Sequence, residues 1–533
     1  MLETELPAKR RTIGEVALLV ILFFTYAGDQ APMVNEAHYL VKAKNFWQPD
    51  WCERDLFVSS GKAHTTFYLL FGWPTKFVSL TATAWMGRLM GWTILAIGLQ
   101  RLSWRLLPYP FFSLGVAVVW IAGIEYGNLA GEWVVGGIEA KVPAYGFLLM
   151  AMAELVDRRW NRVWPLLGFA SAFHVLSGGW SVVAAMLVWL ATEFKRDDRQ
   201  PFFTPALFLG GAISLFGLLP ALWLTMGVSP EDSAFAARVY SYFRLKHHLL
   251  PANFQTIWYL RHGVLIVATL AAFCYCRHLS NAQSWRRLAW FTIGAISIAA
   301  IGLLIGMLPQ YAPDLAAKLL RYYWFRSTDA IVPLAFALLT MRSIAAADAM
   351  SWPRVAGTCV IIVAVASISY SSWTRARLGV PPAGSHRLLG RDVDATAAEQ
   401  QDVFRDWLAV CRWARGATPP DEIFLTPRHQ QTFKWHADRA EVVNWKDVPQ
   451  DAASLKSWYQ RFQDVFPFWR GNARLGSIRV TIRYAELRRY RQEYGVRFMI
   501  VDRRITGPNL PLAKIYPLGH EINSTYAVYE LPY

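Results

Sequence analysis

The sequence GDQAPMVNEAHYL occupies residues 28–40 and interrupts an otherwise apolar N-terminal region. Three acids stand in this stretch or shortly after it, namely Asp29, Glu36 and Asp55. Carboxylates beside a transmembrane helix are costly to remove from water, so their presence favours a polar cavity built for chemistry. A solvated loop is the alternative interpretation.

The composition around this stretch is that of a multi-pass membrane protein. The chain has 533 residues, of which 54% are hydrophobic and only 17% are charged. Its formal net charge is +16, but Lys and Arg recur in short clusters between apolar runs. Because this pattern is typical of membrane topology, it gives no reason to expect a nucleic-acid partner.

The distribution of Lys and Arg predicts the topology when basic clusters are placed in the cytoplasm. It indicates an α-helical protein of the inner cell membrane with about eleven transmembrane helices, a cytoplasmic N-terminus and an outer tail. Residues 65–80 are broken by Trp73-Pro74, so they are predicted to be interfacial helices and not a crossing. The predicted spans are about 13–28, 82–100, 110–124, a segment ending at Asp157, 163–176, 178–195, 203–226, 258–276, 288–308, 329–345 and 354–372.

The chain divides where its composition changes, after Pro381-Pro382. Residues 1–375 are expected to form the transmembrane domain with its first outer loop at 29–64, and residues 376–533 a soluble extracytoplasmic domain. Alternating helical and strand patterns in the tail predict a small α/β fold. The expected helices are 400–415, 451–462 and 484–494, and the expected strands are 422–426, 441–443, 498–502 and 526–531.

Two further outer segments, residues 229–262 and 314–329, concentrate basic side chains among aromatic ones. This arrangement suits a lipid phosphate, whose charge needs donors while its tail stays in the bilayer. Interfacial snorkelling of the Arg and Lys stems is an equally weighted alternative for any one residue. The candidate phosphate or donor-binding residues are Arg244, Lys246, His247, His248, Arg321 and Arg326.

An acid on one side and phosphate-binding cations on the other indicate a transferase, in which the acid takes a proton from an acceptor hydroxyl. Glu36 is the candidate base, with a structural charge at the N-terminus of a helix as the alternative. Asp29 and Asp55 are further catalytic candidates, and for Asp29 a topology or capping role is preferred. These three acids could also hold Mg or Mn, although no spaced His or Cys ligand set supports a metal. Residues assigned to acceptor binding or support are His38, His64, His174 and Asp329, and for His174 a packing role is preferred.

The segment Asn35-Glu36-Ala37-His38-Tyr39 resembles the Asp-Glu-x-x-aromatic signature of the GT-C superfamily of integral-membrane glycosyltransferases, in its protein O-mannosyltransferase and aminoarabinose transferase branches. Lys62-Ala63-His64 and the residues 84–88 are similar in order and spacing. Asn35 departs from the signature, because the family has an acid there. The tail between Thr426 and Asp451 also resembles a bacterial family with a domain of unknown function.

The resemblance implies a polyprenyl-phosphate-linked sugar donor. The leading hypothesis is therefore glycosyl transfer from such a lipid to an acceptor glycan, lipid or protein on the outer face, with the tail as an acceptor-binding or lid domain. It requires Glu36 to share a pocket with the predicted cations. One rival is a transporter or flippase for a lipid or an anionic solute, and another is a catalytically inactive GT-C scaffold that binds glycolipid, which the Asn35 departure keeps open.

Overall fold

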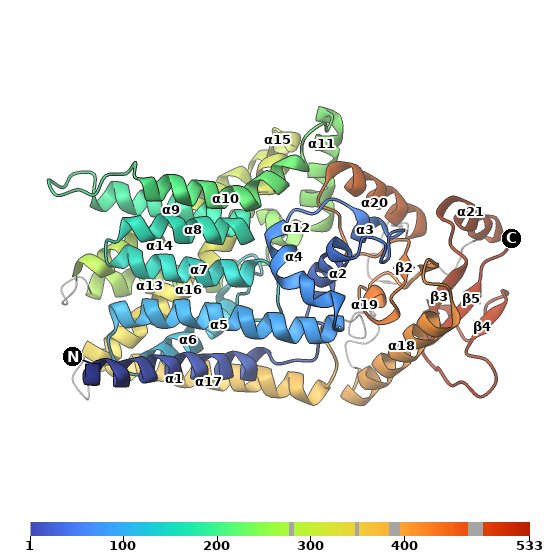
Figure 1. Ribbon diagram of the computed structural model, residues 1–533, viewed down its shortest axis with the longest axis horizontal. Coiled ribbons are helices and arrows are strands. Elements are labelled where there is room, and N and C mark those ends of the chain that lie inside the picture. The colour runs from blue at the N-terminus through green and yellow to red at the C-terminus, as the bar shows by residue number, and fades with distance from the viewer. Residues whose placement is uncertain (1, 277–281, 347–350, 383–394, 467–482) are drawn as a thin grey trace. The chain divides into compact units, whose positions relative to one another are not determined.

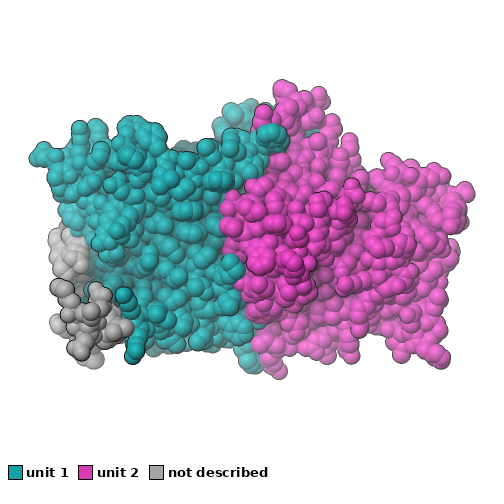
Figure 2. Space-filling view, viewed as in Figure 1, with its two compact units in different colours: residues 1–28, 88–223, 233–373 teal, residues 29–87, 224–232, 374–533 magenta. Residues whose placement is uncertain are grey.

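The computed structural model describes residues 2–276, 282–346, 351–382, 395–466 and 483–533. Two compact units make up the chain (Figure 2). Unit 1 comprises residues 1–28, 88–223 and 233–373, and unit 2 comprises residues 29–87, 224–232 and 374–533. The unit that contains the tail therefore also contains residues 29–87, which include the predicted first outer loop.

Unit 1 is helical throughout its described elements, and its long helices lie side by side (Figure 1). Every predicted span overlaps an observed helix, which confirms the prediction of a multi-pass helical membrane protein. The long helices are α1 (Leu2–Ala27), α5 (Leu80–Leu106), α6 (Phe112–Gly127), α7 (Lys141–Val156), α8 (Trp160–Phe173), α9 (Val175–Thr192), α10 (Pro205–Trp223), α13 (Thr256–Cys276), α14 (Ala282–Ile305), α16 (Arg326–Ala346) and α17 (Trp352–Leu378).

Six helices in the described part of the chain are long and apolar enough to cross a membrane, judged by length and composition. They are α9, α10, α13, α14, α16 and α17. Only 11% of the apolar window is buried inside the protein in α10 and in α13, so most of their apolar surface is left for lipid to cover.

Close helix packing in unit 1 depends on small residues. A Cβ atom added to Gly168 of α8 would lie 2.4 Å from the carbonyl oxygen of Gly210 in α10. One added to Gly210 would lie 2.4 Å from the carbonyl oxygen of Trp164. Glycine is therefore required at both positions for α8 and α10 to approach this closely, as is common between membrane helices.

Short elements connect the long helices of unit 1 and carry most of the predicted cations. Between α10 and α13 lie α11 (Pro230–Arg238), the π-helical turn η2 (Val239–Arg244), α12 (Lys246–Leu249) and η3 (Pro251–Asn253). Between α14 and α16 lie η4 (Leu308–Gln310) and α15 (Pro313–Leu320).

The first polar region of unit 2 folds into α2 (Glu36–Trp47), α3 (Leu56–Ser59), α4 (Thr65–Gly72) and η1 (Trp73–Lys76). Residues 65–76 thus form two short elements, and the first of them ends at Gly72, next to the break that the sequence predicts at Trp73-Pro74. The Asp55 side chain begins α3 because its carboxylate accepts hydrogen bonds from the backbone N–H groups of Phe57 and Val58.

The tail of unit 2 contains a five-stranded mixed sheet in the order β2-β1-β3-β5-β4. Strand β1 is parallel to β2 and β3, whereas β5 is antiparallel to β3 and β4. Helix α18 (Ala397–Ala417) packs its buried Trp407 and Val410 against the sheet residues Phe424 and Val528. The remaining elements are β1 (Ile423–Leu425), α19 (Phe433–Ala437), β2 (Ala440–Glu441), α20 (Ala452–Val465), α21 (Tyr484–Tyr494), β3 (Phe498–Asp502), α22 (Arg503–Thr506), β4 (Lys514–Tyr516) and β5 (Tyr526–Glu530).

Candidate functional site

A buried ionic cluster lies at the centre of unit 2. The ammonium of Lys434, on α19, is 2.5 Å from a carboxylate oxygen of Glu441, 2.8 Å from Asp447 and 3.2 Å from Asp55. All four side chains are at most 2% exposed. We call Lys434, Asp55, Glu441 and Asp447 the Lys434 cluster. Because Asp55 comes from the first polar region and the other three from the tail, the cluster joins these two segments.

Neutral donors complete the coordination of the carboxylates. The Asn444 side chain donates hydrogen bonds to Glu441, at 2.7 Å, and to Asp447, at 2.8 Å. The backbone N–H of Glu441 donates to Asp55 at 3.1 Å, and the Thr426 hydroxyl donates to the second oxygen of Glu441. These hydrogen bonds and ion pairs offset the free-energy cost of removing the charges from water.

The cluster also sets the protonation of its members. Burial disfavours the charged form of Lys434, but the three carboxylates outweigh it and hold its pKa well above the usual value. Burial alone would raise the pKa of Asp447, yet Lys434 and His38 lower it below the usual value. For Glu441 burial dominates and raises the pKa, with Lys434 as the main opposing charge. Lys434 and Asp447 are therefore charged at neutral pH, whereas burial favours the protonated form of Glu441.

The three predicted catalytic acids have separate surroundings. Asp29 forms an ion pair with Arg375 at 3.1 Å, and Asp55 belongs to the Lys434 cluster. Glu36 begins α2, is 1% exposed, and accepts a hydrogen bond from the backbone N–H of Met33 at 2.7 Å. Among the described residues no group of three His, Cys, Asp or Glu side chains could hold a metal ion. The cation beside Asp55 in this structure is the ammonium group of Lys434.

Two of the predicted support residues, His38 and His64, lie close to the tail. The Nδ1 atom of His38 is 3.4 Å from Asp447, and burial lowers the pKa of this histidine, so it is neutral at neutral pH. The Nε2 atom of His64 lies 3.3 Å from the Gln450 amide nitrogen and 3.5 Å from the Tyr39 hydroxyl.

Lys42 is an unusual residue of this region that sequence reasoning missed. Its ammonium is buried in α2 and donates to neutral acceptors, the Ser60 hydroxyl at 2.8 Å, the Ser60 carbonyl at 3.3 Å and the Gly61 carbonyl at 2.7 Å. Burial, together with the charge of Lys62, lowers the pKa of Lys42 to about 7. In the sequence Lys42 is simply a lysine in the segment after residue 36, and nothing near it shows whether its side chain is buried or exposed.

In unit 1 the structure brings three of the predicted cations around a pair of tyrosines. The hydroxyls of Tyr240 and Tyr323 are 3.1 Å apart. The Arg321 guanidinium lies 5.5 Å from the Tyr240 ring centre, and that of Arg326 lies 4.2 Å from the Tyr323 ring centre. Burial raises the pKa of Tyr323, and the nearby charges of Arg326 and Arg244 oppose that rise. We call these five residues the tyrosine–arginine cluster.

The backbone at this cluster is unusual in two places. Arg244 ends the π-helical turn η2, and such turns occur frequently at functional sites. Tyr323 has a φ of 51°, in the left-handed region that a bulky residue seldom adopts. Strain of this kind persists where the surrounding structure enforces it, and it is concentrated at binding sites.

Arg326 also belongs to a buried ionic network that sequence reasoning did not connect. It forms an ion pair with Glu132, which is 2.7 Å from Lys141, and Lys141 is 2.8 Å from Glu139. Its guanidinium lies 3.0 Å from the Nε2 atom of His174. Part of the charge of Arg326 is therefore offset within the protein.

The other predicted side chains of unit 1 are not part of the tyrosine–arginine cluster. Asp329 is fully buried and accepts hydrogen bonds from the backbone N–H groups of Leu129 and Ala130, which is a structural role. His248 lies 2.6 Å from the Ala130 carbonyl oxygen. Lys246 and His247 are exposed on α12.

Comparison with known proteins adds two findings. The family described as Domain of unknown function (DUF6798) matches residues 405–465, which include Lys434, Glu441 and Asp447. The crystal structure of ArnT from Cupriavidus metallidurans bound to undecaprenyl phosphate is similar with a TM-score of 0.53 and 11% sequence identity. The similarity covers 98% of this chain and 97% of that one. No curated protein matches the chain.

At 11% identity this similarity establishes the fold. It extends over both units, so the membrane helices and the tail are arranged along the chain as in that protein. The chain therefore has the fold of ArnT from Cupriavidus metallidurans, and residues 405–465 of its tail match the DUF6798 family model.

Proposed function

We propose that the chain transfers a glycosyl group from a polyprenyl-phosphate-linked donor to an acceptor on the outer face of the cell membrane. The observation that carries this proposal is the tyrosine–arginine cluster, in a chain with the fold of a protein that binds undecaprenyl phosphate. Arginine pairs well with phosphate, and aromatic rings beside it suit the boundary between lipid and water.

The proposed reaction assigns a step to each part of the chain. Glu36 takes the proton of an acceptor hydroxyl, and the acceptor oxygen forms a bond to the anomeric carbon. The bond between that carbon and the phosphate oxygen breaks, and its electron pair leaves with the polyprenyl phosphate. Arg244 and Arg321 stabilise the departing phosphate, and the tail binds the acceptor or covers the site.

A glycolipid-binding scaffold without transfer is the second candidate, and two observations favour it. Asn35 stands where the resembling families have an acid, and Glu36 is almost fully buried with one oxygen bound to its own loop. The transporter hypothesis has less support. Such a protein uses ionisable groups deep in its helices. Arg88, within α5, is a fully buried group of this kind, whereas the ion pairs Arg105–Asp157 and Arg158–Glu193 lie where helices end.

The test combines lipid identification with a transfer assay on the full chain. Native mass spectrometry of the purified protein should detect a bound polyprenyl phosphate, and the protein should then move sugar from synthetic undecaprenyl-phosphate-linked sugars to a membrane-extract acceptor. Lipid binding together with transfer supports the enzyme. Lipid binding without transfer, across a panel of sugars, supports the scaffold. Absence of any polyprenyl lipid, with no binding of added undecaprenyl phosphate, overturns both.

A further inference from the structure

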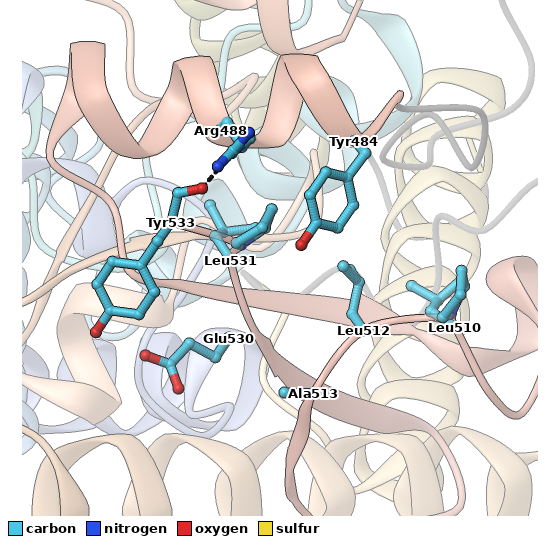
Figure 3. A pocket seen from close by; sticks show the side chains of 10 residues that line it. Tyr484, Arg488, Leu510, Leu512, Ala513, Glu530, Leu531 and Tyr533 are labelled. Carbon is cyan, nitrogen blue, oxygen red and sulfur yellow. Dashed lines mark hydrogen bonds between the residues drawn. The ribbon is translucent and has the colours of Figure 1, made fainter.

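A pocket in the tail, separate from both clusters, has not been given a role. Its volume is about 650 Å³, within the range of small-molecule sites. Figure 3 shows its walls, which come from α21, from the loop before β4 and from the end of β5. The lining residues are Tyr484, Arg488, Leu510, Pro511, Leu512, Ala513, Glu530, Leu531, Pro532 and Tyr533.

Hydrogen bonds hold the walls of this pocket in place. The backbone N–H of Leu510 donates to the Tyr529 hydroxyl at 3.2 Å, and that of Glu530 donates to the Ala513 carbonyl at 2.9 Å. Helix α21 is anchored by Tyr490, which is 2% exposed and whose hydroxyl donates to the Asp464 carbonyl at 2.8 Å. A pocket with fixed walls binds a ligand at a lower entropic cost than one that must form on binding.

Two aromatic rings at the pocket are largely exposed to solvent, and the Arg491 guanidinium lies 3.5 Å from the centre of one of them, the Tyr533 ring. Tyr484 is 59% exposed and Tyr533 is 78% exposed, although both are large and largely apolar. In Figure 3 the Tyr484 side chain points into the space between Leu512 and Leu531, and the Tyr533 ring lies on the far side of Leu531. Rings exposed around a pocket offer flat apolar faces to a ligand, while their hydroxyls stay available for hydrogen bonds.

Charged groups of both signs stand beside these rings. Glu530 accepts from Arg497 at 2.8 Å, which fixes its carboxylate at the pocket wall. Arg488 donates from Nε to the Tyr533 backbone oxygen (Figure 3), and a guanidinium group has further N–H donors. The pocket therefore presents flat apolar faces, an acceptor and donors close together.

This combination matches the chemistry of a sugar. A pyranose ring has apolar C–H faces and an edge of hydroxyl groups that both donate and accept. An acyl chain offers no hydrogen bonds to the remaining N–H donors of Arg488 or to the remaining acceptor sites of Glu530, and these groups would lose water on contact with it. We propose that this pocket is a saccharide-binding site for a short oligosaccharide. The proposal concerns binding alone; if the proposed transfer function also holds, the site would receive the glycan part of the acceptor.

The experiment uses the full chain in nanodiscs made without glycolipid, because maltoside detergents would present sugar headgroups of their own. Maltotriose, mannotriose and chitotriose are titrated, and binding is followed by saturation-transfer difference NMR and calorimetry. At least one trisaccharide should bind with a Kd below about 1 mM. Tyr484→Ala and Tyr533→Ala should each weaken it about tenfold, whereas Tyr484→Phe should retain most of the affinity because the ring remains.

Ile522→Ala is the matched control, because Ile522 is 88% exposed in the same unit and does not line the pocket. Its affinity should equal that of the unmodified chain, and the thermal midpoints of all variants should agree. The proposal is overturned if none of the three sugars binds, or if Tyr484→Ala and Tyr533→Ala bind the sugar as tightly as the unmodified chain does. Because no transfer reaction enters the measurement, its outcome is independent of the proposed enzymatic function.

Discussion

The ammonium group of Lys434 lies 3.2 Å from the carboxylate of Asp55, and both side chains are almost completely buried. This contact connects the segment matched by DUF6798 to the polar region that contains the predicted catalytic acid Glu36. A change in the tail can therefore alter the loop that carries Glu36 without touching that residue.

Replacing Lys434 by Ala should destabilise the protein by about 3 to 5 kcal/mol, because three buried carboxylates lose their cation. The thermal midpoint of the full chain in detergent measures this effect. Lys456→Ala is the control, since the Lys456–Asp232 ion pair is half exposed and should contribute less than about 1 kcal/mol. Equal midpoints for both variants would show that the Lys434 cluster does not stabilise the fold.

The same variant should acquire an affinity for divalent cations. Removal of the ammonium leaves oxygen atoms of Asp55, Glu441 and Asp447 around an empty position, and carboxylate oxygens are the ligands that Ca²⁺ and Mn²⁺ prefer. Addition of Ca²⁺ or Mn²⁺ should raise the midpoint of Lys434→Ala, while Lys434→Ala combined with Glu441→Gln should respond less. A midpoint that stays constant with added cation would contradict this expectation.

Lys42 should make stability depend on pH. In the folded protein its pKa is about 7, whereas the ordinary value is 10.5. Between these values the unfolded chain binds more protons than the folded one, so stability should rise with pH from about 7 to 10. The charged groups that act on Lys42 are Lys62, Asp451, Asp447 and Asp55.

Lys42→Met should remove most of this rise, and the measurement is the thermal midpoint at a series of pH values. Lys44→Met is the matched control on the same helix, because Lys44 forms an ion pair with Asp438 at 2.8 Å. The control should keep the slope of the unmodified chain. If Lys42→Met keeps it as well, Lys42 is not the group responsible.

Replacing Glu36 by Gln should lower the rate of sugar transfer about 10²- to 10⁴-fold, because the amide cannot accept the proton of the acceptor. Binding of undecaprenyl phosphate should be unchanged. Glu53→Gln, an exposed acid of the same region, should retain full transfer. If Glu36→Gln transfers sugar at the unmodified rate, Glu36 is not the catalytic base and another group must accept the proton.

Arg321→Ala should weaken binding of undecaprenyl phosphate about tenfold or more, since a hydrogen bond to a charged group contributes about 1.5 to 3 kcal/mol. Arg238 provides the control, because it also lies in a short element between long helices of unit 1, and its ion pair with Asp314 is exposed. Binding to nanodiscs that carry the lipid gives both affinities. If the two variants lose the same affinity, a general effect of positive charge explains the result.

The helices were predictable because their signals are local. Apolar runs of the required length and basic clusters between them fix where a membrane helix begins and ends, so even the weak span at 110–124 corresponds to α6. The tail strands 498–502 and 526–531 were found from alternation and β-branched content. Strand β4 has the sequence KIY and was missed because, unlike β1 with the sequence IFL, it is not a continuous apolar run. Helix α19 was missed because its five residues form little more than one turn.

The site was predictable only in part. Residue type and surroundings identified Arg244, Arg321 and Arg326, which the structure brings around one tyrosine pair. Nothing local indicated that Asp55 would meet Lys434, because such a contact depends on how distant segments fold together. The same holds for Glu132, which offsets the charge of Arg326. The sequence was sufficient to select the candidate residues, but only the structure shows which side chains they contact.

The sequence separation within the Lys434 cluster has a consequence for biosynthesis. Asp55 and Glu441 are 386 residues apart, and translation at about 5 to 20 residues per second takes about 20 to 80 seconds to cover that distance. During this interval Asp55 has no ammonium partner and must remain hydrated. The Lys434 cluster can therefore form only after the ribosome has synthesised the tail, by which time most membrane helices have already been inserted. A truncation before residue 434 would leave a nascent chain with an exposed, incomplete first loop, which quality-control proteases could recognise.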